Sequence, residues 1–115
     1  MGRKVVITGM NIISSLGLNL EENWRNLSAG KSGVVPISLF DASDCETKIA
    51  AQVPGGFEAY VPKFCKKRIA QQMSRVTAMA FVCASEAIEK SGIDFGAMDR
   101  WRSAVIMGAV STGNS

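Results

Sequence analysis

Residues 3–33 read RKVVITGMNIISSLGLNLEENWRNLSAGKSG, in the order of a strand, a tight loop, a capped helix and an exit turn. Residues 4–8 are β-branched and almost continuously apolar, and this pattern predicts a strand covered on both faces. Asn19 stands three residues before Glu22, which is the spacing of a capping box that opens a helix. Gly30 can end that helix. The apolar residues recur on one helical face: Leu20, Trp24 and Leu27.

The rest of the chain continues the alternation of strands and helices. Residues 48–53 form a short apolar run before Pro54, which predicts an edge or hairpin strand. Residues 104–107 predict a second buried strand, and the segments 31–44 and 57–62 are predicted to be irregular connections. Strands that alternate with helices favour an α/β fold in which helices cover a parallel sheet.

The longest helical pattern runs from about residue 63 to residue 91. Within it, residues 78–84 have almost no polar side, so we expect this stretch to be buried all round. Cys83 lies in this stretch without a neighbouring cation, and burial should leave its thiol inert. Ser91 and Gly92 supply a stop. The predicted apolar face repeats every three or four residues: Ile69, Met73, Val76, Ala80, Cys83 and Ala87.

Composition favours a globular protein of a reducing compartment. The chain has 115 residues, of which 47% are hydrophobic, and its net charge is +3. Its cysteines are far apart and form no CxxC pair, which argues against a disulfide framework: Cys45, Cys65 and Cys83. No apolar stretch approaches the roughly 20 residues that span a bilayer, and the N-terminus lacks a signal-peptide core. We therefore expect a cytoplasmic protein without a membrane partner.

The sequence excludes several kinds of site. It has no histidine, and therefore no His-based metal site, Cys–His couple or imidazole base. After Gly9 the next glycine is Gly17, so the dinucleotide-binding fingerprint is absent. Residues 30–32 read GKS, but Arg25 stands where a phosphate-binding loop needs an earlier glycine.

A basic cluster is the main candidate for a functional surface. Its members are Lys63, Lys66, Lys67 and Arg68. Such a cluster can attract an acidic protein by steering and by ion pairs, although charge runs are more often a solvated helix face. Nucleic-acid binding fits less well because the net charge is only +3. We expect no nucleic-acid partner.

The order of these segments resembles the N-terminus of the β-ketoacyl-acyl carrier protein synthases, the condensing enzymes of the thiolase superfamily. Members begin with a strand close to VVVTG, then a loop ending in an SPLG-like stretch, and then a helix that carries Trp and ends in AGKSG. The similarity covers essentially the whole chain, but only the first quarter or so of a typical member. The matching residues are Val5 to Gly9, Ser14 to Gly17, Trp24, Ala29 to Gly33, Ile37, Phe40, Asp41, Lys48 to Ala51 and Met73.

The resemblance implies a thiolase-like layered α/β fold, of which residues 1–115 form only the N-terminal part of the first half. It implies a 3-oxoacyl-[acyl-carrier-protein] synthase that condenses an acyl-enzyme thioester with malonyl-acyl carrier protein in fatty acid biosynthesis. Such enzymes are homodimers, and no cofactor or metal is implied. The family's nucleophilic cysteine and its two assisting basic residues lie beyond Ser115, so residues 1–115 are expected to hold no catalytic residue.

The resemblance also implies that an acyl carrier protein docks at the start of the long helix, with Lys63, Lys67 and Arg68 as the candidate contacts. Arg68 falls on a position that is commonly basic in the family. Other positions depart from the family pattern: Gln71 and Gln72 replace Arg or Lys, Ser74 replaces Asp, and Ser111, between Gly108 and Gly113, replaces an apolar residue of the acyl pocket.

Two other interpretations stay open at this point. The chain could belong to a non-catalytic partner subunit of the same fold, of chain-length-factor or polyketide type, as the departures above suggest. It could also be a free-standing small binding domain.

Overall fold

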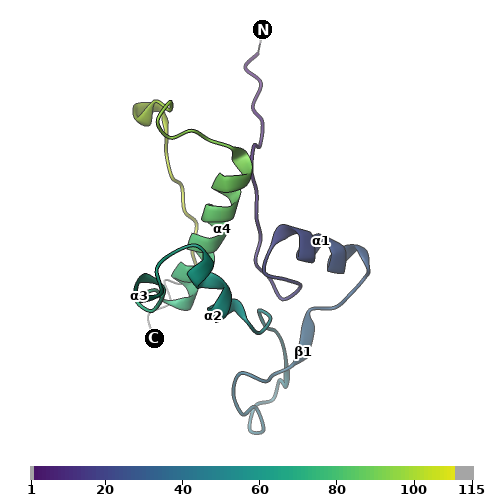
Figure 1. Ribbon diagram of the computed structural model, residues 1–115. Helices are drawn as coiled ribbons and strands as arrows, with labels where there is room; N and C mark the ends of the chain where they lie inside the picture. Colours follow the sequence, from purple (N-terminus) through teal and green to yellow (C-terminus); the bar gives the residue numbers. More distant parts are fainter. Residues whose placement is uncertain (1, 111–115) are drawn as a thin grey trace.

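The computed structural model describes residues 2–110 (Figure 1). Within these residues the chain forms four α-helices, two short strands and two short 3-10 helices. In chain order the elements are α1 (Leu20–Ser28), β1 (Val34–Pro36), β2 (Ile49–Ala51), α2 (Phe57–Tyr60), η1 (Val61–Lys63), α3 (Lys67–Ala70), α4 (Arg75–Ser91) and η2 (Arg100–Arg102).

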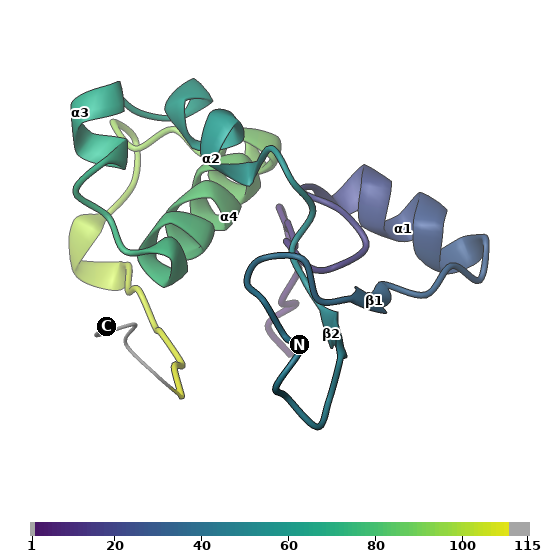
Figure 2. The ribbon, with the colours of Figure 1, turned by 90° about the horizontal axis from the view of Figure 1, so that it is seen from below.

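The chain is far more open than a folded protein of its length. Figure 2 shows α1 and the strand pair on one side and the helices α2, α3 and α4 on the other. The accessible surface is 9396 Å², whereas a folded monomer of this mass exposes about 6,100 Å². The radius of gyration is 17.3 Å, against about 13 Å for a compact domain of this length. Much apolar surface is therefore left uncovered.

The two segments predicted to be buried strands are extended, unpaired and exposed. Val5 is 92% exposed and Ile106 is also 92% exposed, and neither segment is a strand. The prediction of strands at 4–8 and 104–107 is therefore wrong for this structure. An extended apolar run becomes a strand only when a neighbour pairs with its N–H and C=O groups, and no described residue does so. The parallel sheet is likewise absent from residues 2–110.

The sheet that does form is an antiparallel pair of β1 and β2. Val34 pairs with Ala51 and Pro36 pairs with Ile49. The prediction of a hairpin strand within 48–53 is confirmed, but the prediction that 31–44 is wholly irregular is wrong. The β-branched side chains of β1 favour the extended backbone, which becomes a strand once β2 returns beside it.

Helix α1 forms where the sequence predicts it, but it packs through a different face. The Asn19 side chain accepts a hydrogen bond from the backbone N–H of Glu22 at 2.9 Å, so the predicted cap is confirmed. Trp24 is 68% exposed and Leu27 is also exposed, so the predicted apolar face is not buried. The buried residue of α1 is Asn23, because its amide binds the preceding loop.

The long helix predicted over 63–91 is broken into η1, α3 and α4. The break lies before Ser74, whose extended backbone and side chain begin α4 by accepting a hydrogen bond from the N–H of Thr77. This local cap competes with continuation of the helix. The stop at Gly92 is confirmed, with φ of +65°. The prediction that 57–62 is irregular is wrong, since α2 and η1 occupy it.

The core lies between α2, η1 and α4. Its buried apolar residues are Phe57, Val61, Ala78 and Val82. Residues 78–84 are not buried all round, since Ala84 is exposed and only Ala78 and Val82 are buried. Among the described residues, no helix is both long and apolar enough to cross a membrane.

Candidate protein-docking surface

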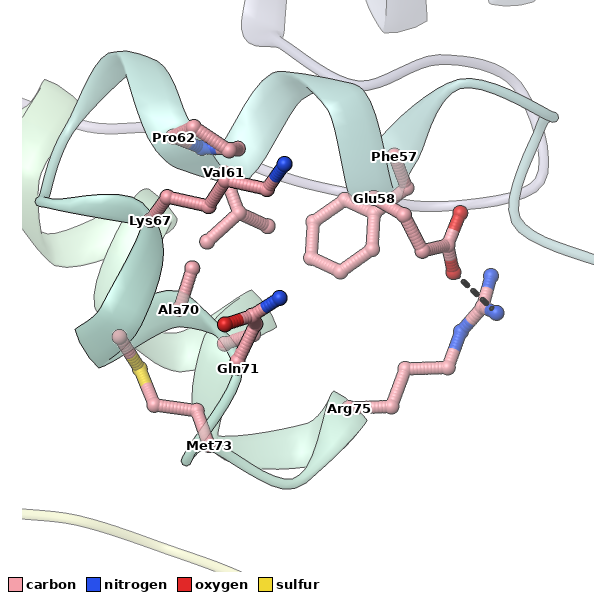
Figure 3. A pocket seen from close by; sticks show the side chains of 10 residues that line it. Phe57, Glu58, Val61, Pro62, Lys67, Ala70, Gln71, Met73 and Arg75 are labelled. Carbon is pink, nitrogen blue, oxygen red and sulfur yellow. Dashed lines mark hydrogen bonds and ion pairs between the residues drawn. The ribbon is translucent and has the colours of Figure 1, made fainter.

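A hollow of about 510 Å³ opens between α2, η1, α3 and the first turn of α4 (Figure 3). Its wall is mostly apolar because the core residues of these short helices face one another across it. The apolar lining consists of Phe57, Val61, Pro62, Ala70, Met73 and Ala78. The polar lining consists of Glu58, Lys67, Gln71 and Arg75. An apolar wall with a few polar groups is the usual make-up of a binding site.

An ion pair forms one side of the hollow. The Arg75 guanidinium donates to the Glu58 carboxylate at 2.6 Å, and the side chains are 41% and 66% exposed. The same guanidinium lies 5.7 Å from the centre of the Phe57 ring. Because water reaches both partners, the ion pair contributes little to stability, and either group can exchange partners.

The structure separates the three predicted docking residues. Lys67 lines the hollow from α3. Lys63, in η1, instead places its ammonium 4.7 Å from the centre of the Tyr60 ring. Arg68 is exposed on α3 and does not line the hollow. Only Lys67 of the three is therefore part of this site.

Sequence reasoning missed Glu58 and Arg75. They are 17 residues apart and meet only because the chain turns through η1 and α3. Arg75 directly follows Ser74, the N-cap of α4. A serine before a helical pattern is a signal of a helix start, and this signal could have placed Arg75 in the first turn of α4.

Tyr60 ties α2 to α4. Its hydroxyl donates to the Glu86 carboxylate. Burial and the neighbouring Glu86 carboxylate raise the pKa of Tyr60 to about 12. The other carboxylate oxygen of Glu86 is buried without a hydrogen-bond partner among the described residues.

The three cysteines are free thiols. Burial raises the pKa of the Cys83 thiol, which lies 3.9 Å from the amide nitrogen of Asn11. A raised pKa favours the protonated thiol, in line with the expectation that burial makes Cys83 inert. Cys45 is exposed, and Cys65 is partly buried near the carbonyl of Val61.

Among residues 2–110, no three His, Cys, Asp or Glu side chains gather as metal ligands would. Ser111 and Gly113, named above for the acyl pocket, lie outside the described residues.

The sequence matches the family described as "Beta-ketoacyl synthase, N-terminal domain" over residues 2–115. A Streptomyces violaceoruber protein assigned as granaticin polyketide β-ketoacyl synthase 1 is 37% identical over 109 residues, 95% of this chain. The 3-oxoacyl-[acyl-carrier-protein] synthase 2 of Coxiella burnetii is 37% identical over 107 residues, 93% of this chain. The tetracenomycin polyketide synthase ketoacyl synthase alpha subunit of Streptomyces glaucescens is 34% identical over 106 residues, 92% of this chain.

These alignments cover 25%, 25% and 24% of the three relatives, so the chain spans about a quarter of their length. The family match extends over all the residues that the structure describes, from the exposed N-terminal segment through α4 to residue 110. This chain therefore belongs to the β-ketoacyl synthase family and is similar to its N-terminal domain.

Proposed function

We propose that this chain is the N-terminal part of a 3-oxoacyl-[acyl-carrier-protein] synthase, an acyltransferase of the condensing type. The observation that carries the proposal is the family match over residues 2–115. It is supported by relatives named 3-oxoacyl-[acyl-carrier-protein] synthase 2 from Coxiella burnetii and Vibrio cholerae, at 37% and 32% identity. In the full-length protein we propose a thiolase-like layered α/β fold, whose sheet would take in the extended segments 4–8 and 104–107.

The proposed reaction joins an acyl group to a malonyl unit. A cysteine thiolate outside this chain attacks an acyl thioester, forms the acyl-enzyme and releases the carrier thiol. Malonyl-acyl carrier protein then loses CO₂, and the electron pair left on its α-carbon attacks the acyl-enzyme carbonyl. The C–C bond forms, the cysteine leaves as thiolate, and a 3-oxoacyl-carrier protein is released. We propose no metal or cofactor for these steps.

The role proposed for this chain is scaffold and docking. Lys63, Lys67 and Arg68 lie on η1 and α3, and their ammonium and guanidinium groups suit the acidic surface of an acyl carrier protein. The full-length protein is proposed to be a cytoplasmic homodimer that acts on acyl and malonyl thioesters. Names of relatives do not favour a non-catalytic partner subunit, because they are synthases and an alpha subunit.

The test is a condensation assay on the full-length protein. Supplied with acyl- and malonyl-loaded carrier protein, it should release CO₂ and form the 3-oxoacyl carrier protein, both detected by mass spectrometry. Replacing the active-site cysteine with alanine should abolish the acyl-enzyme adduct and the product. A full-length sequence with glutamine or alanine at that position, or an intact protein that forms no adduct, would contradict the proposal. Longer poly-β-keto products would assign the condensation to polyketide synthesis, as in the relatives named for that pathway.

A further inference from the structure

We draw no further inference here: the strongest candidate, the polar cluster between α2 and α4 in which Tyr60 bonds one carboxylate oxygen of Glu86 and the other is buried without a partner among residues 2–110, carries nothing because nothing in the structure shows which group meets that second oxygen.

Discussion

Asn23 is the residue on which the loop before α1 depends. Its side-chain amide donates to the carbonyl oxygens of Ile12, Gly17 and Asn19 at 3.2, 2.9 and 2.8 Å. Its carbonyl oxygen accepts a hydrogen bond from the Ser14 hydroxyl. A buried amide with its donors and acceptor satisfied supports a loop whose own backbone forms an isolated bridge between Ser14 and Gly17.

Asn23→Ala should therefore lower the free energy of unfolding of the full-length synthase by about 2 kcal/mol, because three carbonyl groups and the Ser14 hydroxyl each lose a hydrogen bond to this side chain. Urea unfolding followed by circular dichroism measures the loss. Asn23→Asp, which keeps the shape but removes the donors, should be similarly destabilising. Ser28→Ala, at an exposed position of the same helix, is the control. An Asn23→Ala midpoint equal to that of Ser28→Ala would contradict this role.

Tyr60 gives a prediction on pH. Burial and the Glu86 carboxylate raise its pKa to about 12 in the folded protein, whereas a tyrosine in an unfolded chain titrates near pH 10. The stabilisation is therefore fully present below about pH 10 and is lost as the pH rises towards 12. The ultraviolet difference titration between the full-length synthase and its Tyr60→Phe variant should show a tyrosinate midpoint near 12 that falls to about 10 in denaturant. A midpoint near 10 in the folded protein would refute the Tyr60–Glu86 contact.

At the scale of elements, Ser74 decides where α4 begins. Its hydroxyl accepts a hydrogen bond from the N–H of Thr77 at 3.2 Å and bonds the Thr77 hydroxyl at 2.9 Å. Ser74→Ala should lower the free energy of unfolding by about 1 kcal/mol, the usual value for loss of an N-cap. Ser74→Asp should restore most of it, because aspartate also caps helices and favours the positive end of the helix dipole. Equal stability of the serine and alanine proteins by urea unfolding would contradict the assignment of this cap.

The approach of the N-terminal segment to α4 depends on Gly9. A Cβ at this position would lie 2.0 Å from the carbonyl oxygen of Ala87 and 3.0 Å from Ser91. Gly9→Ala should force the segment away from α4 and cost several kcal/mol in the full-length synthase, as other severe overpacking does. Gly2→Ala is the matched control, because no atom lies within 4 Å of its Cβ. Thermal unfolding of the two variants compares them, and equal melting temperatures would show that the two elements do not touch this closely.

At the scale of the whole molecule, the described chain lacks a core sufficient for its length. Its buried apolar residues number four among the described residues, Phe57, Val61, Ala78 and Val82. The segments around Val5 and Ile106 leave unpaired backbone and apolar side chains in water. Exposed strand-like edges of this kind promote association between chains.

Residues 1–115 expressed alone should accordingly be poorly soluble or molten. Calorimetry should show no sharp unfolding transition, and a hydrophobic dye should bind strongly, because fluctuating structures expose apolar surface. The full-length synthase is the control and should unfold cooperatively. A sharp, reversible transition of the isolated chain would contradict the prediction and would show that these segments find partners within the chain itself.

Features whose causes lie within a few residues could be predicted from the sequence. The cap of α1 at Asn19 and the end of α4 at Gly92 follow from short-range hydrogen bonds and backbone preference, and the order of motifs was enough to indicate the family. The start of α4 at Ser74 likewise depends on a hydrogen bond within a few residues, and the sequence could have predicted it.

Which faces of the helices and strands are covered depends on contacts between distant parts of the chain. The β-branched run at 4–8 favours an extended backbone, but pairing needs a neighbouring strand that no local pattern supplies. The apolar face of α1 is exposed and Asn23 is buried, because the Asn23 amide donates hydrogen bonds to three carbonyl groups of the preceding residues. The hollow with its Glu58–Arg75 pair likewise exists only because α2 and α4 meet in space. Contacts between residues far apart in the sequence depend on how the whole chain folds, and the periodicity of the sequence does not predict that arrangement.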